Sequence, residues 1–277
     1  MRDDRPAQPG SCKVFPGGGR CEIRDGFIRG GLKALLSPGC VDWRHTPHNP
    51  ATNMTAAVQA KPPFSDKYDL ALAQAYLEKH HRGLRRRLTT WRETQLAGRA
   101  LKLAGNPESV LDMPCGAGRF WPMLASQPTR RLLAGDVSPA MLQIAAGAAE
   151  PAVLARFETL ALMDAFALDL PDRAVEHVLC MRLLHHMATA ADRVRILREL
   201  HRVARRGATV SLWVDGNLQA RRRMRQDART TRADGYRRVV ERAVIEAEFA
   251  QVGFAIRRRL DVLPGLSMLR LYVLDKV

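Results

Sequence analysis

Hydrophobic and polar positions change their period twice along the chain. Residues 1–62 show no sustained helical or strand period and are rich in Gly and Pro, which predicts a poorly ordered N-terminal extension. Met54 would also serve as the first residue of a compact protein, so whether residues 1–53 belong to the native protein stays open. Over residues 65–103, apolar residues recur at helical spacing among Arg and Lys, which predicts two helices that cap the following domain.

From residue 107 onward, short apolar runs alternate with amphipathic helical segments. The predicted strands span residues 110–113, 132–135, 159–163, 175–181, 208–214, 256–263 and 268–275. The predicted helices span residues 120–126, 139–149, 191–204 and 240–252. Alternation at this interval implies parallel strands joined by right-handed crossovers, and the turn at Pro264 and Gly265 implies a final antiparallel hairpin. We therefore predict an α/β fold with a Rossmann-like, doubly wound, seven-stranded sheet, mostly parallel with an antiparallel edge hairpin.

The first predicted strand runs directly into a glycine-containing turn and a helix. Gly116 and Gly118 allow the backbone to approach a ligand at the carboxyl end of that strand. Asp136 follows the next strand, where an acid accepts ribose hydroxyls. A dinucleotide site would need a third Gly where Trp121 stands, and Asp112 before the turn would repel a pyrophosphate. The same acid favours a positively charged ligand.

These residues carry a resemblance to a known family. The segment Asp112-Met-Pro-Cys-Gly-Ala-Gly118 resembles motif I of class I S-adenosylmethionine-dependent methyltransferases, of the small-molecule type grouped with the ubiquinone and menaquinone methyltransferases. Pro114 replaces the first glycine of the commoner form. Further motifs recur in order at Asp136-Val-Ser-Pro-Ala-Met-Leu142, at Asp164-Ala-Phe166, and at Cys180-Met-Arg-Leu-Leu-His-His-Met187. The resemblance implies that residues 63–277 are a methyltransferase domain with S-adenosylmethionine as its cofactor.

The resemblance also implies cofactor roles for individual residues. Asp136 would bind the ribose hydroxyls, Val137 would pack on the adenine, and Asp164 would accept a hydrogen bond from the adenine amino group. The implied cofactor-binding residues are Asp112, Pro114, Cys115, Gly116, Gly118, Asp136, Val137, Ser138, Met141, Asp164, Ala165 and Arg182. Taken alone, each of the three acids is also explained as an ordinary helix-capping or turn residue. Three acids in order at successive strand ends favour a binding site, and no metal site is expected.

Candidate catalytic groups follow the fourth strand of the domain. His185 and His186 are placed where the methyl acceptor should lie, and one of them is a candidate general base for an acidic acceptor. The alternative is that one packs between sheet and helix while the other faces solvent. Cys115 and Cys180 lack the context of a covalent nucleophile. Met181-Arg-Leu-Leu184 differs from the Asn/Asp-Pro-Pro-Tyr/Phe tetrapeptide of exocyclic-amine methyltransferases, so we do not expect those acceptors.

Charge adds a second possible class of acceptor. The formal charge of +16 and the pI near 10.6 attract anionic partners. Residues 217–238 carry eight Arg, which predicts either a mobile lid that grips an anionic acceptor or a solvated, partly disordered basic helix. The five cysteines lack CxxC spacing, and no leader pattern or long apolar run occurs, so we expect a cytoplasmic protein without a transmembrane segment.

Three hypotheses follow from the sequence. The leading one is a methyltransferase that acts on a small-molecule or lipid-like acceptor, which could be anionic. The second is an RNA methyltransferase that uses the Arg-rich insert, and the third is a non-catalytic module that binds S-adenosylmethionine. The oligomeric state and the choice among O-, N- and C-methylation stay open.

Overall fold

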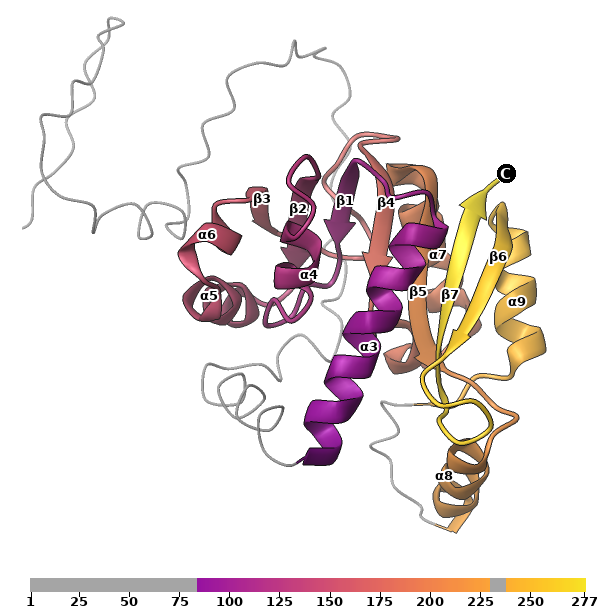
Figure 1. The fold of residues 1–277 in the computed structure, drawn as a ribbon. Coiled ribbons are helices and arrows are strands. Elements are labelled where there is room, and N and C mark those ends of the chain that lie inside the picture. Colours follow the sequence, from indigo (N-terminus) through magenta and orange to yellow (C-terminus); the bar gives the residue numbers. More distant parts are fainter. Residues whose placement is uncertain (1–83, 230–237) are drawn as a thin grey trace, which may run out of the picture. The chain divides into compact units, whose positions relative to one another are not determined.

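The computed structural model describes residues 84–229 and 238–277. The predicted N-terminal extension, the first part of the predicted helical cap, and residues 230–237 of the basic insert lie outside the described residues. In the described part, helices and strands alternate (Figure 1). In chain order the elements are α3 (Leu84–Leu103), β1 (Ser109–Asp112), α4 (Trp121–Ala125), β2 (Arg131–Asp136), α5 (Pro139–Ala148), α6 (Pro151–Leu154), β3 (Phe157–Leu162), β4 (Val175–Cys180), the 3-10 helix η2 (Leu184–His186), α7 (Ala190–Val203), β5 (Ala204–Trp213), α8 (Leu218–Arg229), α9 (Arg242–Gln251), β6 (Phe254–Asp261) and β7 (Leu269–Lys276).

The strands form one seven-stranded sheet in the order β3-β2-β1-β4-β5-β7-β6. The first five strands in this order are parallel, and β7 pairs antiparallel with both β5 and β6. The predicted α/β fold is therefore confirmed, including its antiparallel edge hairpin. Leu111 of β1 pairs with Leu133 on one side and with Val178 on the other, so β1 and β4 meet where the winding of the chain reverses. In such sheets, ligands bind at the carboxyl ends of the strands beside this point.

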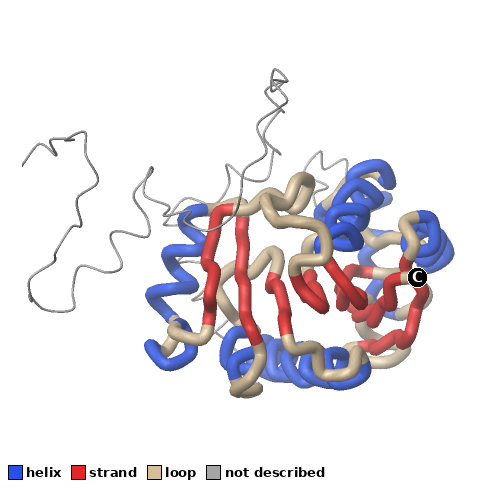
Figure 2. The backbone as a smooth tube through the Cα atoms, turned by 90° about the horizontal axis from the view of Figure 1, so that it is seen from above, coloured by secondary structure: helices blue, strands red, loops and turns tan. Residues whose placement is uncertain are grey.

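Both faces of the sheet are buried by helices (Figures 1 and 2). Neighbouring residues of β1 pack against different helices. Val110 packs with residues of α3, α4 and α5, and Leu111 packs with residues of α7 and α9. Alternate side chains of a strand point to opposite faces. A strand covered on both faces must be apolar throughout, which explains the continuous hydrophobic runs of the sequence.

Some elements differ from the predicted ones. The strand β5 begins at Ala204, directly after α7, although its first polar residues Arg205 and Arg206 hide it in the hydrophobic pattern. The short helices α6 and η2 were not predicted, because three or four residues carry no period. The first half of the basic insert forms the helix α8, so in this half the structure has the basic helix that was one of the two alternatives for the insert.

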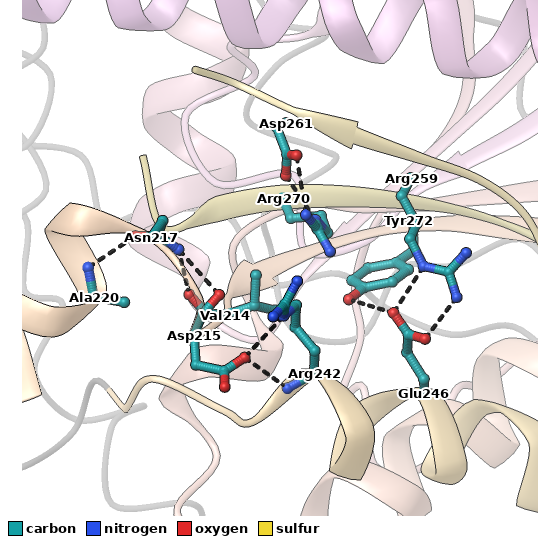
Figure 3. A network of polar contacts seen from close by, with 10 residues as sticks. All are labelled: Val214, Asp215, Asn217, Ala220, Arg242, Glu246, Arg259, Asp261, Arg270 and Tyr272. Carbon is teal, nitrogen blue, oxygen red and sulfur yellow. Dashed lines mark hydrogen bonds and ion pairs between the residues drawn. The ribbon is translucent and has the colours of Figure 1, made fainter. Parts of the chain in front are cut away.

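Polar contacts close the base of the basic insert (Figure 3). The side chain of Asn217 caps the start of α8 and donates to the carbonyl oxygen of Val214 at 2.8 Å. Asp215 Oδ1 accepts from the backbone N of Arg242 at 3.0 Å and from its Nε at 3.2 Å. Val214 and Val240 form an isolated parallel bridge. The insert therefore leaves the sheet and returns to it at the same end of β5.

Ion pairs join the two strands of the edge hairpin to each other and join the hairpin to α9 (Figure 3). Arg270 of β7 contacts both carboxylate oxygens of Asp261 of β6, at 2.6 and 2.9 Å. Arg259 contacts both oxygens of Glu246 of α9, at 2.8 and 2.6 Å, and Tyr272 donates to Glu246 at 3.2 Å. Such partly exposed pairs add little stability each, but they fix which face of α9 lies on the sheet. Among the described residues, no helix combines the length and apolar character that a bilayer crossing needs.

Candidate active site

A cavity of about 850 Å³ lies at the carboxyl ends of the parallel strands. Its wall is formed by the turn between β1 and α4, the ends of β2, β3 and β5, the η2 turn after β4, and the N-terminal half of α3. All predicted cofactor-binding residues line the cavity except Asp112 and Ser138. Both predicted catalytic residues, His185 and His186, line it as well. The topology thus brings together motifs that are more than seventy residues apart in the chain.

The glycine turn needs glycine for two different reasons. Gly116 and Gly118 have φ angles of 53° and 71°, in the left-handed region that side chains disfavour. A Cβ atom at Gly118 would also lie 2.8 Å from the ring of Trp121, whereas a Cβ at Gly116 would meet no atom within 4 Å. The turn is tied to the sheet by a hydrogen bond from the backbone N of Cys115 to the carbonyl oxygen of Gly135 at 2.9 Å.

Asp136 connects the end of β2 to the glycine turn. Its Oδ2 accepts from the backbone N of Gly116, and its Oδ1 accepts from the backbone N of Ser138, both at 2.9 Å. Burial raises the pKa of Asp136, and these backbone donors oppose the shift. A carboxylate offers about four acceptor sites, so Asp136 can accept further hydrogen bonds on the side that lines the cavity. Ser138 in turn accepts from the backbone N of Met141 at 3.3 Å, so it caps α5 instead of lining the cavity.

Asp164 stands at the end of β3, on the same side of the cavity. Its Oδ1 accepts from the backbone N of Phe166 at 2.9 Å, which fixes the side chain in a tight turn. The side chain is half-buried and lines the cavity together with Val137, Met141 and Ala165. An acid, two apolar side chains and a small residue therefore face one space beyond β2 and β3.

Asp112 lies beneath the cavity and not on its surface. All four residues of β1 are buried because the strand is central in the sheet, and Asp112 is fully buried. Burial, with a smaller contribution from Asp136, raises the pKa of Asp112 to about 8. Trp121 is near enough to oppose this shift, but neither carboxyl oxygen has a hydrogen-bond partner of good geometry among the described residues. Asp112 is thus protonated at neutral pH, and the negative charge we expected from it does not face the cavity.

The two histidines occupy different environments. The ring of His185 is buried and stacks on Trp213 of β5 with 4.6 Å between ring centroids. His186 is half-buried, and its ring centroid lies 4.5 Å from that of His185. The carbonyl oxygen of His185 accepts from the backbone N of Arg238 at 2.9 Å, so the far end of the basic insert touches this turn. Both rings border the cavity, and neither points only to solvent.

Sequence motifs did not reveal the contribution of α3. Arg87, Thr90 and Trp91 line the cavity at helical spacing, and the Trp91 side chain is 57% exposed. Two turns into the helix, Glu93 is fully buried and forms ion pairs with Arg119 and Arg182. For Arg87 the sequence offers a cluster of basic residues, which is typical of a solvated helix face and also of a helix that holds an anionic substrate. For Thr90, Trp91 and Glu93 it offers only their place in a helical pattern.

Cysteine and metal chemistry find little support in this site. Burial raises the pKa values of the Cys115 and Cys180 thiols well above their ordinary range, so both stay protonated at neutral pH. A protonated thiol is a poor nucleophile. In the ranges 84–229 and 238–277, no group of three or more His, Cys, Asp or Glu is arranged to hold a metal ion.

Comparison with known proteins decides the class of the domain. Residues 110–207 match the model of a family described as a methyltransferase domain. The chain carries an S-adenosylmethionine-dependent methyltransferase domain. The matched residues run from β1 into β5 and include the glycine turn, all three acids and both histidines of the cavity. The domain is therefore that of an enzyme, with S-adenosylmethionine as its cofactor.

Solved structures agree with this fold. The magnesium protoporphyrin IX methyltransferase of Synechocystis PCC 6803 with bound SAH aligns at a TM-score of 0.62 and 16% identity, covering 77% of this chain and 98% of that one. The same enzyme with bound SAM aligns at a TM-score of 0.58 and 16% identity, covering 81% and 100%. A protein of Bordetella parapertussis aligns at a TM-score of 0.54 and 18% identity, covering 66% of both chains. Likeness at these identities concerns the fold.

Proposed function

We propose that this methyltransferase acts on a small-molecule or lipid-like acceptor. The observation that carries the proposal is the extent of the cavity, which continues from the acids at the ends of β2 and β3 to an aromatic end beside β5 and α3. Trp91, Trp213 and the two histidines line that end. A volume of about 850 Å³ lies within the range of about 300–1,000 Å³ typical of small-molecule sites.

The cofactor would lie across the ends of β1, β2 and β3. In this arrangement, Asp136 accepts hydrogen bonds from the ribose hydroxyls, and the apolar side chains of Val137 and Met141 pack on the adenine. Asp164, beside Ala165, accepts from the adenine amino group. The glycine turn, with Pro114 and Cys115, leaves the backbone open to the ligand. Asp112 and Ser138 do not line the cavity. Asp112 supports it as a buried residue, and Ser138 caps the start of α5.

The acceptor would lie beside η2 and the end of β5. The cofactor bound there would supply a methyl group on a positively charged sulfur, and S-adenosylhomocysteine would remain after its transfer to the acceptor atom. Alignment and exclusion of water supply most of the acceleration. Where the acceptor carries an acidic proton, we assign the base to His186, because its ring is half-buried while the His185 ring is stacked on Trp213.

Resemblance adds some support to this class of acceptor. The glycine turn resembles that of the ubiquinone and menaquinone methyltransferases, whose acceptors are lipid-like. The Synechocystis enzyme of similar fold is named for magnesium protoporphyrin IX, a small molecule.

A labelled-methyl transfer assay tests the proposal. The purified protein is incubated with methyl-labelled S-adenosylmethionine and with cell lysate separated into RNA, lipid and metabolite fractions. We expect label in the lipid or metabolite fraction, and we expect Asp136→Ala to abolish it. Asp169→Ala, which removes an exposed acid outside the cavity, is the matched control. Label in no fraction would support a non-catalytic binding module instead.

An RNA acceptor is the second candidate, favoured by the exposed arginines of α8. Arg221, Arg222 and Arg225 are exposed, and the insert that contains them returns to the cavity edge at His185. Binding to a phosphate backbone through several arginines weakens steeply with salt. Label in the RNA fraction, together with RNA affinity that falls at least about tenfold between 50 and 200 mM salt, would replace our proposal with this one.

A further inference from the structure

The loop between β6 and β7 presents leucines to solvent beside the start of α8 (Figure 1). Its residues 262–268 include no charged side chain, and Leu263 and Leu266 are 52% and 54% exposed. Leu218, the first residue of α8, is 49% exposed. Single exposed leucines are common on protein surfaces, whereas several that gather at one place mark a surface that contacts something apolar.

Backbone hydrogen bonds hold this loop against α8. The backbone N of Leu218 donates to the carbonyl oxygen of Gly265, and that of Gln219 donates to the carbonyl oxygen of Leu266, both at 3.0 Å. Within the loop, the carbonyl oxygen of Leu263 accepts from the backbone N of Leu266 at 3.2 Å. Three carbonyl groups of the loop are therefore already hydrogen-bonded, so its tip can leave water without stranding them.

The helix α3 adds a fourth leucine. Arg92 Nε donates to the carbonyl oxygen of Val262 at 3.4 Å, so α3 lies against the first residue of the loop. Leu88 precedes Arg92 by one helical turn, on the same side of α3, and it is 64% exposed. We call the following four residues the leucine rim: Leu88, Leu218, Leu263 and Leu266.

Arginines of α8 stand beside the leucine rim. Arg221, Arg222 and Arg225 share one face of the helix with Leu218, because they follow it at helical spacing. All three are exposed, and none forms an ion pair within the described part of the chain. The opposite face of α8 carries Ala220, which is buried. Cationic and apolar side chains therefore point away from the domain on the same side.

The composition of this surface decides what covers it. A second copy of the chain, joined by twofold symmetry, would bring like-charged arginines together. RNA would use the arginines but leave the leucines unmatched, and residues 218–227 and 262–268 include no aromatic side chain for base stacking. A bilayer with anionic lipids matches both components, because headgroups attract guanidinium groups and the acyl boundary takes up leucine. We propose that the leucine rim and the arginines of α8 dock the protein on such a membrane surface.

The docking surface adjoins the cavity. Trp213 lines the cavity and pairs with Leu269, the residue that begins β7 after the loop. Trp91, one turn after Leu88 on α3, lines the cavity as well. A lipid-like acceptor would therefore have a short path from the membrane to the cavity. Docking goes beyond the proposed function and does not depend on which acceptor is methylated.

Cosedimentation with vesicles tests the proposal. The full-length protein is mixed with vesicles of phosphatidylcholine alone, or of two parts phosphatidylcholine and one part phosphatidylglycerol. We expect binding to the anionic vesicles to be at least about tenfold tighter, because each basic residue near an anionic surface adds to the attraction. Added salt should weaken this binding.

Two variants test the two components of the surface separately. Arg221→Gln/Arg222→Gln/Arg225→Gln should weaken binding to the anionic vesicles about 10- to 100-fold. Leu263→Ser/Leu266→Ser keeps every charge and should weaken it about tenfold. Both variants should keep the circular dichroism spectrum and the S-adenosylmethionine affinity of the wild type, because the replaced side chains are exposed and lie outside the cavity.

A matched control removes the same charge elsewhere. Arg99→Gln/Arg198→Gln/Arg258→Gln changes exposed positions of α3, α7 and β6, and its vesicle binding should stay within about threefold of the wild type. An equal loss in this control and in the α8 variant would overturn the proposal, because overall charge would then explain the binding.

Two further outcomes would also overturn the docking proposal. The first is vesicle binding that does not change in the Leu263→Ser/Leu266→Ser variant. The second is binding to single-stranded RNA without binding to either vesicle, which would assign the arginines of α8 to RNA. Cosedimentation measures no methyl transfer, so the proposed function stays with the labelled-methyl assay.

Discussion

The two halves of the cavity are built in different ways. Around the proposed nucleoside site, carboxylates are fixed by backbone N–H groups close by in the chain: the contacts of Asp136 span 20 residues and 2 residues, and that of Asp164 spans 2. In the rest of the cavity, side chains from distant elements form the wall. Glu93 and Arg182 are 89 residues apart, and His185 stacks on Trp213 from another strand. The first half is a property of local turns, and the second is a property of the tertiary fold.

The largest effect should come from adding one methyl group to the local half. Gly118→Ala places a Cβ 2.8 Å from the Trp121 ring at a φ angle of 71°. Strain and overpacking of about 1–3 kcal/mol each should lower the free energy of unfolding and weaken cofactor binding about 100-fold or more. Calorimetric titration and thermal unfolding measure both effects.

Gly147→Ala is the control for that change. Gly147 lies in α5, and a Cβ there would meet no atom within 4 Å. We expect equal or slightly higher stability and unchanged binding. Equal behaviour of the two variants would show that the glycine turn is not the rigid part of the site.

His186→Ala should act on the acceptor half alone. Loss of a general base costs about 100-fold or more in kcat, while the affinity for S-adenosylmethionine should stay within about twofold because the ring does not belong to the nucleoside site. Steady-state kinetics with the identified acceptor, together with cofactor titration, separate the two. A kcat equal to that of the wild type would remove His186 as the base and leave alignment as the main contribution.

Asp136→Asn should give a moderate effect in the local half. The amide keeps the shape of the side chain and one acceptor oxygen, but it loses the charge that receives the N–H groups of Gly116 and Ser138. We expect the cofactor to bind about 10- to 100-fold more weakly, with little change in thermal stability. Asp169→Asn, at an exposed acid, should match the wild type.

The smallest effect on binding should come from Asp112, which supports the local half from below. The folded protein keeps the Asp112 proton until pH is near 8, whereas the unfolded chain releases it near 3.8. The Asp112 contribution to the free energy of unfolding is therefore present at low pH and is lost as pH rises from about 4 to about 8. Asp112→Asn should remove this loss. In urea unfolding at pH 5, 7 and 9, the free energy of unfolding of the variant should therefore rise relative to that of the wild type as pH increases. Parallel pH profiles would contradict a buried, protonated Asp112.

Much of the fold was predictable because each main element is long enough to show its own period. The alternation of strands and helices was sufficient to predict the sheet, and the glycine turn and Asp136 were correctly expected to lie at one edge of it, where both line the cavity. The burial of Asp112 was not predictable, because whether a strand end faces a cavity or lies beneath it depends on what covers it. Likewise, Glu93 looks like any polar residue on a helix until three distant segments meet around it.

The closed base of the basic insert has a practical consequence. Since the segment departs at Val214 and rejoins at Val240, its two ends are already brought together by the bridge and by the pair of Asp215 and Arg242. Lengthening a closed surface segment costs little free energy. The first turn of α8 also contacts the loop between β6 and β7, because the backbone N of Leu218 and of Gln219 donate to the carbonyl oxygens of Gly265 and Leu266. We therefore expect segments of other lengths and compositions to be tolerated after this first turn, with the pairing of β5 and β7 unchanged.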